Sequence, residues 1–331
     1  MCVLVGCCLT IFLNSGKLPS CWNRGPHLED APAIGHPPAS SRAGRYHGPL
    51  RLRSFIPAVA LLTSGLFPAP ALAADDDVAW RWRKFGTADA ALAATFAFGA
   101  VVDRLTPNPN HIRWEAGWAV DAGFRDAVVL GSTDARTAAA RASDVTVGLL
   151  TAQPFADAAI AGFVYGEPET AWQITAISFA AIMANAATTG VVKRITGRAR
   201  PIQTACDADP SYDETCGARP PRSFYSGHAS SAFTVASLTC MHHAHLPLYG
   251  RGWDELACVT AVLAAGTVAY ERVISDRHYL SDVVAGAAMG TLSGALVPWL
   301  LYYRLDGSDR RWIATPRISQ SELGLAALAV W

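Results

Sequence analysis

The chain has 331 residues, enough for one large domain or two small ones, and 51% of them are hydrophobic, which allows a substantial core. Its 27 lysines and arginines balance 27 aspartates and glutamates, which argues against a nucleic-acid-binding protein, because such proteins carry excess positive charge. Only 16% of the residues are charged, and this favours membrane contact without establishing it.

The first 73 residues differ in composition from the rest of the chain. Residues 1–50 are rich in Pro, Gly, Ser and His and have no helical or strand periodicity, which predicts a disordered segment or a mis-assigned start. Residues 51–73 carry two arginines, an apolar stretch and a small-residue cleavage site, which is the order of a secretory signal peptide. An uncleaved membrane anchor is the alternative, and both would send the following residues across a membrane.

Residues 74–144 predict an N-terminal helical region. Thr87–Leu105 is an alanine-rich helical segment, and its Asp89, Asp103 and Arg104 argue against a membrane crossing. The turn-forming sequence TPNPN follows, and the stretch after it mixes charged and apolar residues at helical intervals, as is typical of an amphipathic helix.

Five long apolar segments predict the main domain, residues 145–303. They are Val145–Tyr165, Ala171–Val192, Ala229–Cys240, Leu256–Tyr270 and Val283–Tyr303. The second and the last contain no charged residue and are long enough to cross a bilayer as helices. We therefore expect an all-α fold, an antiparallel bundle of about five or six core helices embedded in a membrane. Residues 304–331 form a tail, either a small hairpin or a loose extension.

The four cysteines outside the leader are of two kinds. Cys206 and Cys216 flank a short polar loop, which predicts a disulfide in an oxidising compartment, with free thiols as the alternative. Cys240 and Cys258 lie inside apolar helical stretches, where we expect ordinary buried thiols that pack as small hydrophobic residues.

Two polar clusters lie at the ends of predicted helices. In KRITGRARP, Lys193 closes an apolar helix and Arg200 precedes a proline; alone, such cations are ordinarily helix-end or interfacial charges. In SFYSGHASSAF, Ser226 and Gly227 lead into the apolar helix that carries His228. Alone, this second cluster is a plain serine N-cap with a glycine in the turn.

A third cluster, RVISDRHYLSD, contains Arg272, His278 and Asp282. If a helix begins near His278, Asp282 lies four residues on and can orient the imidazole, while Arg272 projects from the preceding loop. A surface ion pair with a helix-capping histidine is the alternative. In an antiparallel bundle, the helices that end at Lys193, start at Ser226 and start near His278 bring all three clusters to one end, which is where we expect the active site.

Together the clusters fit the binding of a tetrahedral oxyanion such as phosphate. Lys193, Arg200 and Arg272 offer three cations, and the turn before His228 offers backbone amides at a helix N-terminus. One histidine with a carboxylate partner can act as a nucleophile, and the other can protonate the departing oxygen. No carboxylate-rich metal cage accompanies them in the sequence, so we expect the cations to stabilise the charge, without a metal or another cofactor.

These three motifs resemble the signature motifs of the type 2 phosphatidic acid phosphatase superfamily, which includes bacterial class A acid phosphatases and vanadium haloperoxidases. The resemblance covers roughly residues 145–303. It implies that His278 attacks phosphorus to give a phosphohistidine, that Asp282 orients His278, and that His228 protonates the leaving alkoxide and later acts as a base. It also implies that the phosphoryl oxygens are bound by Lys193, Arg200, Ser226, Gly227 and Arg272.

Two positions depart from the family pattern. Tyr225 stands where proline usually precedes Ser-Gly-His, and Glu271 stands where serine usually precedes the arginine. Neither residue exchanges a proton or forms a bond in the implied mechanism. Glu271 places a negative charge beside the predicted anion site, where we expect it either to weaken phosphate binding or to pair with a surplus cation such as Arg198 or Arg277.

The predicted orientation follows from counting helices. With the leader arginines in the cytoplasm and Thr87–Leu105 not spanning, five later crossings place the active-site end in the periplasm. The leading substrate is then a lipid phosphate or isoprenoid diphosphate at a bacterial inner membrane, with membrane lipid as a partner and no nucleic acid. The alternatives are a soluble periplasmic acid phosphatase acting on small phosphomonoesters, a vanadium haloperoxidase, and a catalytically silent lipid-binding protein.

The sequence MHHAH is a weaker candidate site. His242, His243 and His245 are metal-ligand types, but no cysteine or carboxylate stands at a suitable spacing. We expect solvated or interfacial histidines at the end of the bundle opposite the three motifs.

Overall fold

The computed structural model describes residues 77–304, except residues 116, 215, 218, 219 and 251, and the backbone of residues 311–318 and 323–330. The described residues belong to one compact unit, Arg53–Trp331. The predicted extension at residues 1–50 and the predicted signal peptide or anchor at residues 51–73 lie outside the described residues.

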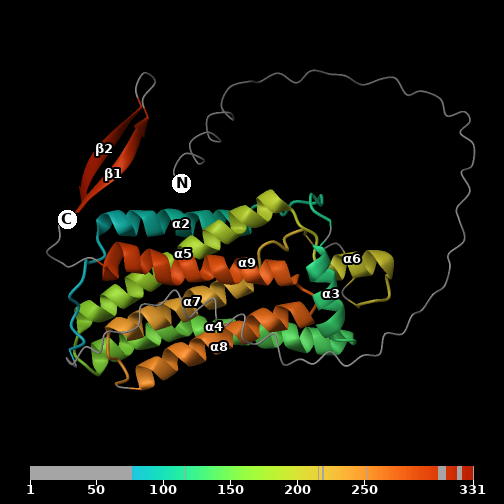
Figure 1. Ribbon diagram of the computed structural model, residues 1–331, viewed down its shortest axis with the longest axis horizontal. Helices are drawn as coiled ribbons and strands as arrows, with labels where there is room; N and C mark the ends of the chain where they lie inside the picture. Colours follow the sequence, from blue (N-terminus) through green and yellow to red (C-terminus); the bar gives the residue numbers. More distant parts are fainter. Residues whose placement is uncertain are drawn as a thin grey trace, which may run out of the picture. The chain divides into compact units, whose positions relative to one another are not determined.

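The described chain consists of a helical bundle and, later in the sequence, a β-hairpin (Figure 1). The helices are α2 (Thr87–Leu105), α3 (Ala119–Val128), α4 (Thr133–Phe163), α5 (Pro168–Thr196), α6 (Pro201–Ala208), α7 (Gly227–His245), α8 (Trp253–Ile274) and α9 (Leu280–Thr291). After α9 the helix continues through two π-helical turns, Leu292–Leu296 and Trp299–Tyr303. The predicted all-α bundle is confirmed.

The tail takes the hairpin form, one of the two that the sequence left open. Strand β1 (Arg311–Ile318) pairs antiparallel with β2 (Leu323–Val330). Arg311 is opposite Val330, and Ile318 is opposite Leu323.

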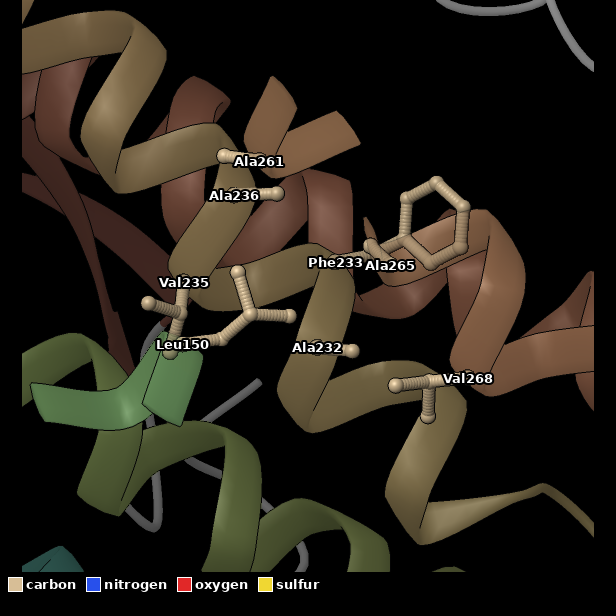
Figure 2. Close-up of a cluster of buried hydrophobic side chains, with 8 residues drawn as sticks. All are labelled: Leu150, Ala232, Phe233, Val235, Ala236, Ala261, Ala265 and Val268. Carbon is tan, nitrogen blue, oxygen red and sulfur yellow. The ribbon is translucent and has the colours of Figure 1, made fainter. Parts of the chain in front are cut away.

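Helix α7 is the centre of the bundle and contacts α4, α5, α8 and α9. The helix itself carries small and apolar residues on all its sides. Ala229, Ala232 and Leu238 are completely buried. A helix that is apolar all round is stable only when other helices cover it. One core cluster joins α7 to α4 through Leu150 and to α8 through Val268 (Figure 2).

Three glycines allow the last long helix to approach α7 closely. They are Gly286, Gly290 and Gly294. A Cβ atom on Gly290 would overlap the backbone oxygen of Ser230, and one on Gly294 would overlap that of Thr234. This approach holds the N-terminal end of α9 beside that of α7.

Among the described residues, three helical segments are long and apolar enough to cross a membrane, by length and composition. They are Pro168–Thr196, Trp253–Ile274 and Leu280–Tyr303. Large apolar side chains also point outward from helices outside this set; Phe98 of α2 is 71% exposed and Phe163 of α4 is 91% exposed. Apolar surface of this kind is typical of a membrane or protein contact.

Helix α2 runs beside α5 from one end of the bundle to the other (Figure 1). Just before α2, Arg83 pairs with Asp89 and donates to the Leu301 carbonyl near the end of the last helix. At the other end, Asp103 pairs with Arg194 in the last turn of α5. The predicted orientation assumes that this helix does not cross the membrane. In the structure, ion pairs compensate the charges of Asp89 and Asp103 at the two ends of this helix, which is not among the three segments of the described chain that are apolar enough to cross a membrane.

Two disulfides stabilise the bundle. Cys206 and Cys216 close the loop after α6, with Cα atoms 5.5 Å apart. Cys240 and Cys258 join α7 to α8, with Cα atoms 4.5 Å apart. The expectation that Cys240 and Cys258 are ordinary thiols is therefore wrong. Apolar surroundings bury a cysteine whether or not it is bonded, and only the packing of α7 against α8 brings this pair together.

Candidate active site

The three motifs meet at one end of the bundle because helices that alternate in direction carry them at matching ends. Lys193 lies in the last turn of α5, and Arg200 directly precedes α6. His228 lies in the first turn of α7, and His278 lies in the loop before α9. Arg272 was expected in a loop, but it lies in the last turn of α8, because the residue after it still packs in the core.

A cleft of about 390 Å³ opens at this end of the bundle. Arg200, His228 and Arg272 line it together with Arg141 and Asp144 of α4. Arg272 is only 6% exposed. Within the described residues, the four arginines that line the cleft, Arg141, Arg200, Arg272 and Arg277, outnumber its carboxylate, so the cleft is suited to an anionic ligand.

The turn before α7 presents a helix N-terminus to this cluster. Ser226 caps the helix by accepting a hydrogen bond from the Ala229 backbone N–H at 3.3 Å. Lys193 lies beside the same turn, since a Cβ atom on Gly227 would be 3.9 Å from its Nζ. The ammonium group also donates to the Arg222 carbonyl at 2.9 Å. A helix N-terminus and an ammonium group both favour a bound anion.

His278 is buried behind the cleft, in a loop shaped by backbone hydrogen bonds. Its N–H donates to the Arg272 carbonyl at 3.1 Å. Its Nδ1 lies 3.6 Å from the Oδ2 atom of Asp282. Burial, followed by the charges of Lys193 and Arg200, holds the pKa of His278 well below its usual range. The ring is therefore neutral near pH 7, as a nucleophilic imidazole must be.

Asp282 accepts two hydrogen bonds that its spacing from His278 did not predict. The helix begins at Leu280, close after His278 as expected, and Asp282 accepts a hydrogen bond from the Tyr279 backbone N–H at 3.0 Å as an N-terminal cap. It also accepts one from Ser223 Oγ at 2.6 Å. These bonds fix the carboxylate next to the His278 ring.

Arg198 is the most important residue of this site that the sequence interpretation misplaced. It was considered a partner for Glu271, but its side chain is completely buried and pairs with Asp282 at 2.6 Å and with Asp121 at 2.9 Å. The guanidinium lies 4.0 Å from the ring centre of Trp114, at a cation–π distance. Arg198 lies between Lys193 and Arg200 in the sequence, and this position could have indicated that it belongs to the site. For Asp121 there was no such signal, because only the packing of α3 against the bundle brings it here.

Helix α4 adds a carboxylate that the motifs do not contain. The Oδ1 atom of Asp144 lies 2.7 Å from Nε2 of His228 and 3.4 Å from Nη1 of Arg272. Its neighbour Ser143 accepts a hydrogen bond from the same arginine nitrogen at 2.9 Å. Asp144 was missed because it precedes the motifs by dozens of residues and lies in a stretch with ordinary amphipathic spacing.

The loop closed by Cys206 and Cys216 packs at the same end. Tyr212, inside the loop, donates to Asp276 at 3.0 Å, and Arg125 of α3 pairs with that carboxylate at 2.6 Å. Asp276 lies two residues before His278. The disulfide loop therefore supports the segment that carries the candidate nucleophile.

The histidines of MHHAH lie at the opposite end, and the expectation that they are solvated or interfacial is wrong for two of them. His242 is completely buried and lies 2.6 Å from the Tyr303 hydroxyl. His243 is 6% exposed and lies 2.6 Å from Asp254. Both histidines make polar contacts between helices, and the hydropathy of the sequence does not reveal such contacts. Within the described part of the chain, no group of three or more His, Cys, Asp or Glu is arranged to hold a metal ion.

Comparison with known proteins agrees with the motifs. Residues 174–306 match the family model of the PAP2 superfamily. This segment belongs to the PAP2 superfamily. The resemblance that the three motifs indicated is thereby confirmed, and the PAP2 segment contains all eight motif residues. Asp121 and Asp144 precede it.

Two individual proteins are similar to the chain. The lipid A 1-phosphatase of Porphyromonas gingivalis is 32% identical over 143 residues, which cover 42% of this chain and 26% of that protein. The chain thus spans about a quarter of the length of this curated relative. The crystal structure of a transmembrane PAP2-type phosphatidylglycerolphosphate phosphatase from Bacillus subtilis is 18% identical, with a TM-score of 0.43, covering 64% of this chain and 94% of that one.

Proposed function

We propose that this protein is a phosphatase that hydrolyses a lipid phosphate or isoprenoid diphosphate through a phosphohistidine intermediate, without a metal ion. The observation that carries the proposal is the convergence of a buried His278, its neighbour Asp282, and the cationic cleft lined by Arg200, His228 and Arg272. The PAP2 segment and the similarity to a lipid A 1-phosphatase support a phosphate carried by a lipid.

In the proposed reaction, a ring nitrogen of His278 forms a bond to phosphorus as the bond from phosphorus to the leaving oxygen breaks. His228 gives its proton to that oxygen. Lys193, Arg200 and Arg272 stabilise the negative charge on the other phosphoryl oxygens. Water, which loses a proton to His228, then attacks the phosphohistidine and releases inorganic phosphate.

We further propose a bacterial inner-membrane location with the active-site end in the periplasm. The disulfide between Cys206 and Cys216 lies at this end and favours an oxidising compartment. Arg83 and Arg304 lie at the other end, as the positive-inside tendency prefers for a cytoplasmic face. Because α2 connects the two ends, this orientation places residue 77 in the cytoplasm, and it therefore requires that residues 51–73 do not carry the following residues across the membrane.

Phosphate release from a panel of substrates tests the proposal. The panel contains phosphatidic acid, phosphatidylglycerol phosphate, undecaprenyl diphosphate and a soluble aryl phosphate, each with and without EDTA. We expect release that persists in EDTA and is lost in His278→Ala, whereas the exposed His111→Ala serves as the matched control. Complete loss of activity on chelation would contradict the metal-free mechanism, and full activity of His278→Ala would contradict the phosphohistidine.

A soluble periplasmic acid phosphatase is the second candidate, and the predicted secretory leader favours it. A leader that delivered residue 77 to the periplasm would leave the site of a membrane-spanning bundle in the cytoplasm, because α2 connects the two ends. A bundle that does not span avoids this conflict. Release of the active protein by osmotic shock without detergent would favour the soluble form.

A further inference from the structure

Asp144 is the acidic side chain that lines the cleft, and it contacts two residues of the proposed machinery. Its Oδ1 atom lies 2.7 Å from His228 Nε2 and 3.4 Å from Arg272 Nη1. The side chain is 58% exposed, so solvent and substrate can reach it. A carboxylate in this cleft repels a bound phosphate. A role of Asp144 in the reaction would offset this repulsion.

The charges around His228 indicate that role. Burial, followed by the charges of Arg272 on α8 and Lys193 on α5, lowers the pKa of His228 to about 4, and the carboxylate of Asp144 opposes this shift. Arg200 lines the same cleft, and His278 lies near in the loop before α9. On α9, Asp282 is already neutralised by Arg198. Asp144 of α4 is therefore the group that favours the imidazolium form of His228.

A general acid must be protonated before the leaving oxygen departs. An imidazolium carries a proton on each nitrogen, so a carboxylate that accepts from Nε2 leaves the Nδ1 proton available for transfer. His278 has the matching arrangement on the opposite nitrogen, since its carboxylate partner Asp282 lies at Nδ1. Each histidine of the site thus has one carboxylate at one ring nitrogen.

We propose that Asp144 is a positioning residue that orients His228 and favours its protonated form for proton transfer to the leaving group. The inference rests on the proposed phosphatase function. In the step concerned, the proton moves from His228 to the leaving oxygen as the bond between phosphorus and that oxygen breaks, and the ring becomes neutral. Asp144 keeps its charge and never touches phosphorus.

Leaving-group dependence tests this role. A nitrophenolate departs without a proton, whereas an alkoxide needs one, so an acid matters for an alkyl phosphate and little for 4-nitrophenyl phosphate. In Asp144→Asn we expect kcat/KM for a short-chain alkyl phosphate to fall about 10- to 100-fold, and that for 4-nitrophenyl phosphate to fall less than about 3-fold. Asp134→Asn, an exposed carboxylate in the first turn of the same helix, is the control and should leave both rates unchanged.

The pH profile gives a second readout. The rate with the alkyl phosphate should decline on the alkaline side as His228 loses its proton, and in Asp144→Asn this decline should begin at lower pH. Equal losses for the two substrates, or an unmoved alkaline limb, would overturn the inference and assign Asp144 a structural role only. If the wild-type chain releases phosphate from neither substrate, the proposed function itself fails, and the role of Asp144 fails with it.

Discussion

Arg198 illustrates how much of this site lies behind the residues that would touch a substrate. Its guanidinium bridges Asp282, the partner of His278, and Asp121 on α3. Arg198, Asp121 and Asp282 are all fully buried, so each charge depends on the others for compensation. The planar fork of arginine presents its donors to both carboxylates in a fixed geometry, which the single ammonium group of a lysine does not do.

Removing this cation should destabilise the protein. In Arg198→Met, two buried carboxylates lose their partner, and we expect the free energy of unfolding to fall by about 3–5 kcal/mol. Phosphate release should fall too, because Asp282 no longer has a fixed position beside His278. Thermal unfolding and phosphate release can be compared with those of Arg104→Met, which removes an exposed arginine at the end of α2. Equal stability of the two variants would show that the buried bridge contributes nothing.

At the scale of elements, the contact between α7 and the last long helix determines where His228 and His278 lie. The backbone N–H of Ser226 donates to the Asp282 carbonyl at 2.9 Å, joining the start of α7 to the start of α9. The glycines that face α7 allow this approach, because any side chain there would meet the α7 backbone. Helix packing of this kind, with small residues at the contact, is common in membrane proteins.

A methyl group at Gly290 should separate the helices. In Gly290→Ala the new Cβ would overlap the Ser230 carbonyl oxygen, so we expect a loss of about 1–3 kcal/mol in stability and at least about a 10-fold loss of phosphate release. Gly266→Ala in α8 is the matched control, since nothing lies within 4 Å of its Cβ position. The control should be unchanged or more stable by up to about 1 kcal/mol. If both variants behave alike, the close approach does not position the site.

For the whole molecule, the sequence predicted what depends on local pattern and missed what depends on packing. Apolar segments with turn signals predicted the bundle, and the motifs at helix ends predicted which end would gather Lys193, His228 and His278. Three features depend on which helices face each other: Asp121 is buried, Asp144 approaches His228, and Cys240 pairs with Cys258. One sequence without its tertiary contacts contains no signal for these relations.

The same limit applies to the proposed orientation, which depends on whether α2 crosses the membrane. Composition argued that its charges keep it out of a membrane, yet Asp89 and Asp103 are both paired with arginines at opposite ends of the bundle. With its 19 residues, α2 is about 28 Å long, close to the thickness of a bilayer core. Residues 77–86 and the end of the last helix therefore lie at one end of the bundle, opposite the site.

Cysteine labelling from one side of the membrane can test this arrangement. Lys84→Cys and Asp134→Cys place a thiol at an exposed position at each end of the bundle, in a background with the four leader cysteines changed to serine. In intact spheroplasts, a membrane-impermeant maleimide should label Asp134→Cys at once and Lys84→Cys only after permeabilisation, because the bundle separates the two positions by the width of a bilayer. Recovery of both variants in the released periplasmic fraction, and not in the spheroplasts, would instead indicate a soluble bundle delivered by a secretory leader. The reverse pattern would place the candidate active site in the cytoplasm.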